Sequence, residues 1–191
     1  MKISNTYING FFCNDETGKN FELINPSTES SYGSLICSNE EQVNNAIDIA
    51  LSNEDTAANL KISQRIEILH QILNGLNDRS SELSNAITLE MGAPIKLTSS
   101  AHIQMGVDHL QNTIKTLKDY SFEEDFDEYQ LVKVPIGLVA LITPWNWPLN
   151  QTLTKISSAI AAGCPIIMKP SEYSGLSSRI LIEIIDKTSL P

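Results

Sequence analysis

The feature that most restricts the fold is a strand–helix–strand pattern in the last third of the chain. Residues 136–142 form an unbroken apolar run, as expected of a strand covered on both faces. A helical pattern follows over 149–160, and Gly163 and Pro165 end it before a second short apolar run at 166–168. Because such crossovers are right-handed, we expect two parallel strands whose carboxyl ends share one edge of a sheet, where ligands bind.

Short strands and amphipathic helices are expected ahead of this unit. Asn9-Gly10 lies between short apolar pieces and predicts a hairpin among small antiparallel strands. Ser38, followed three residues later by Glu41, has the pattern of a capping box and predicts a helix start. Apolar residues at helical spacing predict three more helices, over residues 64–76, 80–91 and 103–117.

Composition excludes several classes of protein. The chain has 191 residues, of which 41% are hydrophobic, so a sizeable core is expected. Its net charge of −10 repels polyanions, and the sequence holds no basic cluster with interleaved aromatic residues, so we expect no nucleic-acid partner. No apolar run approaches the roughly 18 to 20 residues that span a bilayer, and the first residues do not resemble a signal peptide. We therefore expect no membrane partner and a cytoplasmic location.

No metal site is expected. The three cysteines, Cys13, Cys37 and Cys164, are scattered and form no CxxC motif, so reduced thiols are predicted. His102 and His109 flank the apolar stripe of the helix at 103–117. Without a third ligand in the pattern, we expect solvated histidines, and we assign them no chemistry.

The loop after the first strand of the pattern, "TPWNWP", carries the amide of Asn146 between two prolines and two tryptophans. This amide offers two N–H donors on a restricted backbone, and the tryptophans would exclude water from it. Such a donor suits a reaction in which an oxyanion develops. Asn146 could instead bond its own backbone in an Asx turn, and the local pattern alone favours that simpler role.

The loop after the second strand, "KPSE", carries Lys169 and Glu172. An ammonium group donates to hydroxyl oxygens and a carboxylate accepts from hydroxyls, so the pair suits a ribose. Complementing the dipole of a following helix is an equally good explanation of Glu172. There is no GxGxxG after the first strand, so a standard Rossmann pyrophosphate site is not supported.

These two loops, in "PIGLVALITPWNWPL" and "AIAAGCPIIMKPSE", resemble those of the NAD(P)-dependent aldehyde dehydrogenase superfamily. "YING", "INPSTES", the arginine of "SQRIEIL" and "LEMGAP" are similar to the N-terminal half of that family, so the resemblance covers essentially the whole chain. It implies that Asn146 is the oxyanion-hole amide. It also implies cofactor-binding roles for Ile142, Thr143 and Trp145 in the groove, and for Lys169, Ser171 and Glu172 at the adenosine half.

Two departures from the family's pattern are small: Trp147 stands where Phe is commoner, and Cys164-Pro165 replaces an Asn-Thr type pair. The family oxidises an aldehyde through a cysteine thiohemiacetal and thioester, with a glutamate that activates water. The resemblance places both of those residues beyond Pro191, so the chain is expected to be an N-terminal portion that is inactive alone. The alternative is a non-catalytic cofactor-binding or oligomerisation module of the same fold.

NAD is the expected cofactor, since Glu172 would repel a ribose 2′-phosphate, although Lys169 offers a countercharge and leaves NADP possible. The other expected ligand is a small-molecule aldehyde. "EYQLVKV" resembles the family's oligomerisation arm, so the complete protein is expected to be a homodimer or homotetramer.

The expected fold class is α/β, with the N-terminal part of a Rossmann-like parallel-sheet cofactor domain, preceding helices and an edge-strand arm. We divide the chain into three parts. Residues 1–122 form the N-terminal strands and the helical part of the cofactor domain, 123–135 an acidic loop and an oligomerisation-type strand, and 136–191 the first βαβ unit of an incomplete dinucleotide-binding sheet.

Overall fold

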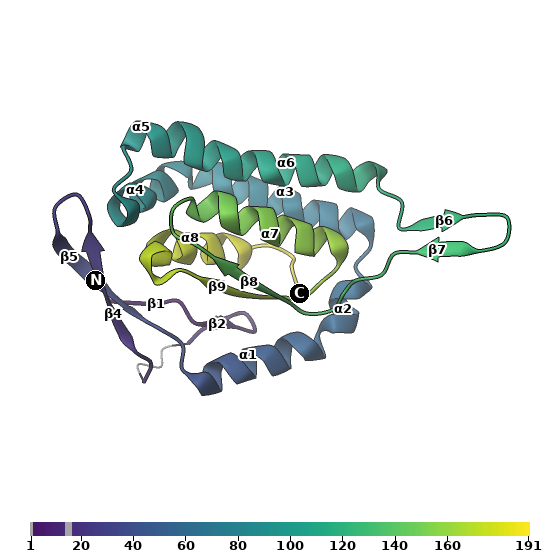
Figure 1. Ribbon diagram of the computed structural model, residues 1–191, viewed down its shortest axis with the longest axis horizontal. Coiled ribbons are helices and arrows are strands. Elements are labelled where there is room, and N and C mark those ends of the chain that lie inside the picture. The colour runs from purple at the N-terminus through teal and green to yellow at the C-terminus, as the bar shows by residue number, and fades with distance from the viewer. Residues whose placement is uncertain (1, 14–16) are drawn as a thin grey trace.

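The computed structural model describes residues 2–13 and 17–191, and these form an α/β fold of helices beside small sheets (Figure 1). The elements in chain order are β1 (Lys2–Ser4), β2 (Tyr7–Ile8), β3 (Phe11–Phe12), β4 (Asn20–Asn25), β5 (Ser30–Ile36), α1 (Glu40–Ser52), α2 (Glu54–Ala58), α3 (Ile62–Asp78), α4 (Ser80–Met91), α5 (Ile95–Leu97), a π-helical turn (Thr98–His102), α6 (Ile103–Asp119), β6 (Glu123–Asp125), β7 (Gln130–Val132), β8 (Val139–Thr143), α7 (Pro148–Ala162), β9 (Ile166–Pro170), a 3₁₀ turn (Glu172–Ser174) and α8 (Gly175–Ile185). None of the described helices is both long and apolar enough to cross a membrane.

The βαβ unit is confirmed. β8 pairs with β9 in parallel, and its last two residues, Ile142 and Thr143, lie opposite Lys169 and Pro170. α7 connects the two strands and ends at Gly163, whose φ of 76° is the left-handed conformation that stops a helix. The loops that follow the two strands therefore start side by side at one edge of the sheet.

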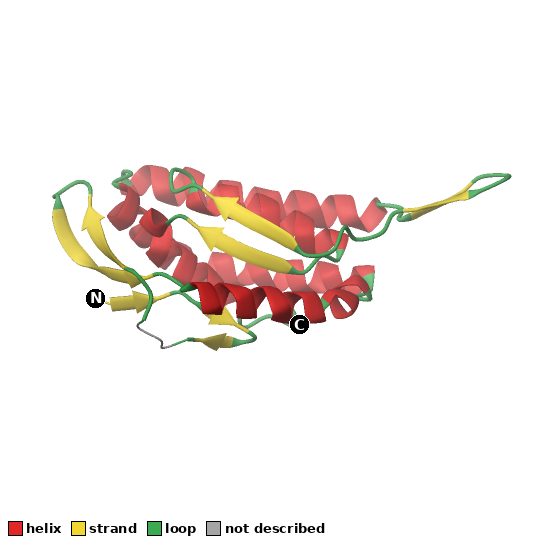
Figure 2. Cartoon of the chain, turned by 60° about the horizontal axis from the view of Figure 1, so that its bottom comes forward, coloured by secondary structure: helices red, strands yellow, loops and turns green. Residues whose placement is uncertain are grey.

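The prediction that the first strand is covered on both faces is wrong for the described part of the chain. Leu141 and Thr143 are buried against the helices, whereas Ile142 is 72% exposed. Figure 2 shows β8 and β9 lying in front of the helical layer. Alternate side chains of a strand point to opposite faces, so an apolar run alone does not show which of the two faces is buried.

The N-terminal hairpin is confirmed at Asn9-Gly10. β2 and β3 are antiparallel, and both turn residues have positive φ, 51° for Asn9 and 81° for Gly10, as a type I′ turn requires. The neighbouring three-stranded sheet has the order β1-β5-β4. Its β1–β5 pair is parallel, so the expectation of purely antiparallel strands in this region is wrong.

The first long helix starts one residue later than the Ser38–Glu41 pattern predicts. Asn39 is the N-cap of α1: its Oδ1 accepts from the backbone N–H of Gln42 at 2.8 Å, and Gln42 Oε1 accepts from the N–H of Asn39 at 2.9 Å. The sequence "SNEEQ" holds two overlapping capping boxes. Ser38 is unavailable to cap because its hydroxyl is hydrogen-bonded to that of Thr6, at 2.7 Å.

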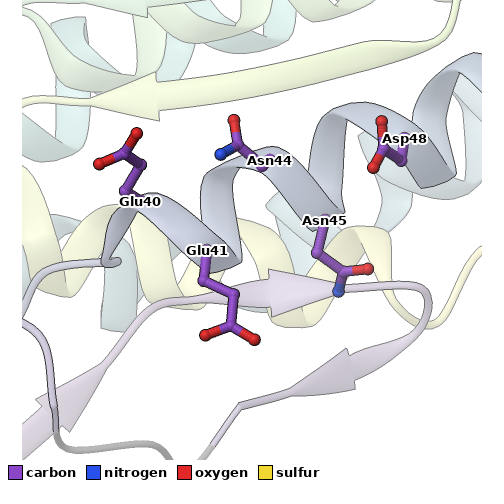
Figure 3. A pocket seen from close by; sticks show the side chains of 5 residues that line it. All are labelled: Glu40, Glu41, Asn44, Asn45 and Asp48. Atoms are coloured by element: carbon purple, nitrogen blue, oxygen red, sulfur yellow. The ribbon is translucent and has the colours of Figure 1, made fainter.

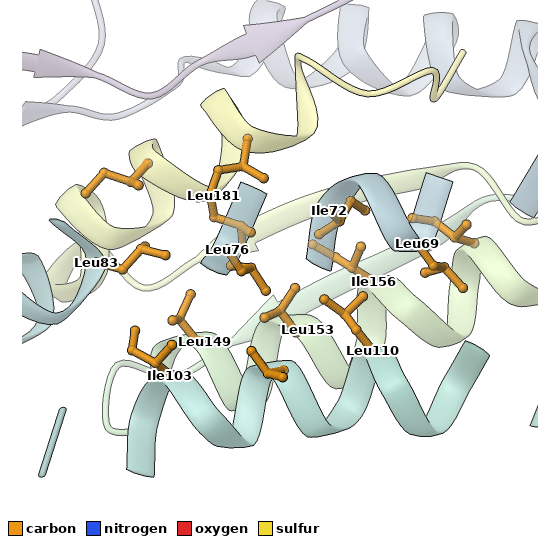
Figure 4. Close-up of a cluster of buried hydrophobic side chains, with 14 of the residues drawn as sticks. Leu69, Ile72, Leu76, Leu83, Ile103, Leu110, Leu149, Leu153, Ile156 and Leu181 are labelled. Atoms are coloured by element: carbon orange, nitrogen blue, oxygen red, sulfur yellow. The ribbon is translucent and has the colours of Figure 1, made fainter. Parts of the chain in front are cut away.

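Helices α3, α6 and α7 build the centre of the core, with α4, α8 and β8 around them (Figure 4). Ile72, Leu110 and Leu153, one from each central helix, have 0% exposure, and each such side chain contributes roughly 1.5–3 kcal/mol. α6 and α7 are in close contact at Gly106, where an added Cβ would lie 2.7 Å from Leu153 Cδ1. The bare backbone of Gly106 therefore sets the spacing of these two helices.

The acidic stretch after α6, predicted as a solvated loop, is partly a strand. β6 pairs with β7 in an antiparallel hairpin that projects from the body of the molecule (Figure 1). Lys133 Nζ lies 2.5 Å from Glu124 Oε1, and the rings of Phe126 and Tyr129 stack with centroids 4.7 Å apart. These cross-strand contacts explain why a charged segment pairs here.

A buried carboxylate connects α4 to α8. Glu90 is 6% exposed and accepts from the backbone N–H of Leu176, at 2.9 Å, and from the N–H and hydroxyl of Ser177. These donors belong to the first turn of α8, which has unpaired N–H groups and a favourable dipole for a carboxylate. Burial nevertheless outweighs the hydrogen bonds and raises the pKa of Glu90 from 4.5 to about 7.

We expect the pKa of Glu90 to appear in the pH dependence of stability. Between its unfolded value of 4.5 and its folded value of about 7, the folded chain holds a proton that the unfolded chain has lost. This stabilisation is complete below the unfolded pKa and is lost as pH rises through the folded pKa. Relative to Glu90→Gln, the wild type should lose on the order of 2–3 kcal/mol of unfolding free energy between about pH 5 and pH 8.

Denaturant unfolding at several pH values measures this difference. Glu82→Gln, at an exposed carboxylate of the same helix, is the matched control for the substitution itself. A parallel pH dependence in the wild type and Glu90→Gln would contradict the assignment.

Candidate functional site

Asn146 lies in the short loop between β8 and α7, at the carboxyl edge of the sheet. The next residue, Trp147, is the N-cap of α7, and Pro148 is the first residue of that helix, where its fixed φ is favourable. The side chain of Asn146 is exposed, and it forms no hydrogen bond with any residue that the structure describes. Its Oδ1 therefore accepts no backbone N–H of the described residues in an Asx turn, and its two N–H donors are available to a ligand.

The two tryptophans of this loop have different environments. Trp145 is 48% exposed, whereas Trp147 is partly buried and stacks on the ring of His102, with centroids 4.0 Å apart and planes at 10°. His102 is 1% exposed, so the prediction of a solvated histidine is wrong. His109 is partly buried, with its Nε2 2.5 Å from Asn150 Oδ1. The sequence carried one signal for the burial of His102: a glycine, Gly106, follows one turn later on the same side of the predicted helix.

Lys169 and Glu172 are neighbours at the same edge of the sheet. Lys169 Nζ donates to Glu172 Oε2 at 3.3 Å, and both side chains remain partly exposed. The pKa of Glu172 is lowered, first by a hydrogen bond from its own backbone N–H and further by Lys169, so its carboxylate is charged at neutral pH. Ser171 Oγ accepts from the N–H of Tyr173 at 3.3 Å, and so caps the 3₁₀ turn that carries Glu172.

The last two residues of β8, Ile142 and Thr143, point to opposite faces of the sheet. Ile142 points to the exposed face, opposite Lys169 in the ladder. Thr143 is 4% exposed and accepts a hydrogen bond from the Thr152 hydroxyl, at 3.4 Å, on the helical side. A ligand over the exposed face can therefore meet the side chain of Ile142, but it can meet only the backbone of Thr143.

The cysteines do not supply a thiol beside Asn146. Cys164 is 5% exposed and follows α7, which has 15 residues, whereas Asn146 precedes the same helix. At 1.5 Å per residue the two residues are separated by about 22 Å along the helix axis. Cys13 and Cys37 follow strands β3 and β5 of the N-terminal sheets.

A shallow acidic hollow lies on α1 (Figure 3). Its lining residues are Glu40, Glu41, Asn44, Asn45 and Asp48. Within residues 2–13 and 17–191, no three His, Cys, Asp or Glu side chains form a group that could hold a metal ion. The hollow is open to solvent, and we assign it no ligand.

The β8–α7–β9 unit places the exposed Asn146 amide and the Lys169–Glu172 pair in neighbouring loops at one edge of a parallel sheet, which is where ligands bind in folds of the α/β class. Comparison with known families then gives a specific assignment. The model of the aldehyde dehydrogenase family matches residues 12–191, and the chain belongs to this family.

Individual relatives agree with this assignment. The chain is 37% identical to a 3-succinoylsemialdehyde-pyridine dehydrogenase of Pseudomonas, over 97% of this chain and 39% of the relative. Among solved structures, an aldehyde dehydrogenase of Bartonella henselae has a TM-score of 0.92 at 35% identity, and covers 97% of this chain and 40% of its own. Aldehyde dehydrogenase C of Pseudomonas syringae, solved as a C291A mutant with NAD+ and octanal, has a TM-score of 0.94 at 31% identity, over 97% of this chain and 38% of that one. The chain thus spans about two fifths of the length of these relatives.

Proposed function

We propose that this chain forms the cofactor-binding and oxyanion-binding part of an aldehyde dehydrogenase, which oxidises an aldehyde to a carboxylic acid with NAD(P)+. The observation that carries the proposal is the juxtaposition at one sheet edge of the Asn146 amide, which has no hydrogen-bond partner among the described residues, and the Lys169–Glu172 pair. Family membership supports the reaction class, and the relative solved with NAD+ and octanal supports the two ligands.

Asn146 acts as a hydrogen-bond donor in this proposal. When a nucleophile adds to the aldehyde, the carbonyl oxygen becomes negatively charged, and a donor already in place stabilises it without reorganisation. Because Asn146 is exposed among the described residues, further residues are needed to cover it and exclude water. The proposal assigns that cover to sequence outside the described residues, and relatives that are more than twice as long support this.

The residues at the sheet edge fit a dinucleotide by their chemistry. The charged carboxylate of Glu172 accepts from ribose hydroxyls, Lys169 donates to hydroxyl oxygens, and Ser171 holds the turn that carries Glu172 in place. Ile142 and Trp145 offer exposed apolar surface beside them, and Thr143 contributes through its backbone. The bound cofactor would supply a hydride acceptor for the aldehyde carbon.

The proposal places the thiol nucleophile and the glutamate base outside these 191 residues. Two observations support it: Cys164 is buried at the far end of α7 from Asn146, and the chain spans about two fifths of its relatives. The chain alone should therefore not oxidise aldehydes. The alternative, a non-catalytic cofactor-binding or oligomerisation module, predicts that the full-length gene product is also inactive.

The first test is Asn146→Ala in the full-length gene product. Turnover should fall by about two to three orders of magnitude, while cofactor affinity changes little, because the donor acts mainly in the transition state. Steady-state reduction of NAD+ with a panel of aldehydes measures the effect.

Two comparisons make this result interpretable. The melting temperature of Asn146→Ala should stay close to that of the wild type, because the side chain is exposed and forms no hydrogen bond with the described residues. Wild-type turnover in Asn146→Ala would leave the residue only a loop-shaping role, and an inactive wild type with every aldehyde would favour the non-catalytic module.

The second test concerns the choice between NAD and NADP. A charged Glu172 accepts the free ribose hydroxyls and repels a 2′-phosphate, so we propose NAD as the preferred cofactor. Glu172→Gln should reduce the preference for NAD over NADP by about tenfold or more. This preference is measured as kcat/KM with NAD divided by kcat/KM with NADP. Glu183→Gln, remote in sequence from the loop, is a control for loss of a carboxylate. An unchanged ratio in Glu172→Gln would remove the carboxylate from the argument.

A third test addresses assembly, for which we propose a homodimer or homotetramer made through the β6–β7 hairpin. Tyr129 and Val134 are 64% and 75% exposed, and the charge of Lys133 is paired within the hairpin by Glu124, which leaves an apolar edge. Light scattering on the full-length protein should give the mass of a dimer or tetramer. Val134→Asp should lower the measured mass towards that of the monomer. A strictly monomeric wild type at micromolar concentration is incompatible with this role.

A further inference from the structure

His102 is a buried polar side chain that the proposed chemistry leaves without a role. Its exposure is 1%, and neither ring nitrogen has a hydrogen-bond partner among the residues that the structure describes. Burial lowers the pKa of its imidazole, so the ring is neutral at neutral pH. Burial of an imidazole without hydrogen bonds costs free energy, and an aliphatic side chain would fill the same space without that cost.

The one ring contact of His102 within the described chain is the stack on Trp147. The centroids are 4.0 Å apart and the planes differ by 10°, so the two rings stack nearly parallel. A flat partner of this kind restricts the tilt of the indole, which a branched aliphatic side chain cannot do. The stack therefore restricts orientation as well as filling volume.

The backbone of α6 brings His102 to this position. A π-helical turn, Thr98–His102, ends at the histidine, and Gly106 follows one turn later on the same side of the helix. At Gly106 the two helices approach closely, with Leu149 and Leu153 of α7 against the bare backbone. The pairs His109–Asn150 and Thr113–Ser157 continue the contact, so α6 and α7 run in the same direction. His102 consequently meets the residue directly before α7, which is Trp147.

Within residues 2–13 and 17–191, no other ring stacks on Trp147. Trp147 is the N-cap of α7, but its side chain makes no capping hydrogen bond, and its backbone has φ −144° and ψ 67°. Asn146 is the preceding residue, so rotation of the junction that moves the indole also moves the amide. Holding Trp147 in place therefore restricts the backbone that carries the Asn146 amide.

We infer that His102 is a positioning residue, which holds the Asn146 amide in its reactive orientation by stacking on Trp147. This inference rests on the proposed function of Asn146. It predicts that what matters at position 102 is a flat ring, and that its nitrogens are dispensable.

The experiment compares two variants of the full-length enzyme. His102→Leu removes the flat partner and keeps an apolar side chain of similar size, so kcat should fall about three- to tenfold while KM for the aldehyde and the cofactor stays unchanged. His102→Phe restores a flat ring without nitrogens and should keep wild-type kcat. His70→Leu, the same substitution at a partly buried histidine of α3, is the matched control.

A double-mutant cycle tests whether His102 acts through Asn146. In an Asn146→Ala background, His102→Leu should cause little further loss of kcat, because the group that it positions is gone. If His102→Leu does not fold, Trp147→Leu breaks the same stack from its more exposed side and should give the same loss and the same lack of additivity.

A readout that does not depend on turnover comes from the tryptophans. With Trp145 and every tryptophan outside these 191 residues replaced by Phe, Trp147 is the remaining tryptophan of the full-length protein, and its fluorescence anisotropy should fall in His102→Leu and recover in His102→Phe. Wild-type kcat in His102→Leu, full additivity with Asn146→Ala, or a loss of kcat that His102→Phe does not restore would each overturn the inference. If Asn146→Ala itself keeps wild-type turnover, the proposed function fails first, and that result is distinguishable because it does not involve position 102.

Discussion

The close contact of α6 and α7 at Gly106 is the constraint on which the rest of the structure depends. With no side chain at this position, the helices approach until Leu149 and Leu153 touch the backbone of α6. Residues further along both helices then meet in pairs, and the core of α3, α6 and α7 closes around Leu110 and Leu153. Because α7 is the crossover between β8 and β9, its placement also fixes the sheet edge at which the loops with Asn146 and with Lys169 and Glu172 lie.

Sequence patterns predicted the parts of the fold that depend on local periodicity. The parallel β8–β9 pair, the stop of α7 at Gly163 and the hairpin at Asn9-Gly10 follow from apolar spacing and from backbone conformations that glycine and asparagine favour. Patterns failed where tertiary contacts decide between local alternatives. Ser38 matched a capping box as well as Asn39 does, but its hydroxyl bonds Thr6, a residue far away in the sequence.

The same division holds for the candidate site. Asn146, Lys169 and Glu172 stand next to strand ends that periodicity locates, so their presence at one edge could be predicted. The stack of His102 on Trp147 could not, because it joins residues 45 positions apart across a helix contact whose geometry a glycine and a π turn determine. Thr143 shows a further limit: neighbouring strand residues point to opposite faces, and only the packed structure tells which one faces the helices.

The β6–β7 hairpin leaves and rejoins the body of the molecule at nearly the same point. The backbone N–H of Lys133 donates to the carbonyl of Phe122 at 2.8 Å, and Arg65 lies over the Phe122 ring at 5.6 Å, so the base of the hairpin is closed and anchored to α3. Strands beyond a closed base can lengthen, shorten or exchange their tip without moving α6 or β8. Related chains can therefore differ in length at this tip, through insertions and deletions, while the carboxyl edge of the β8–β9 sheet keeps its geometry.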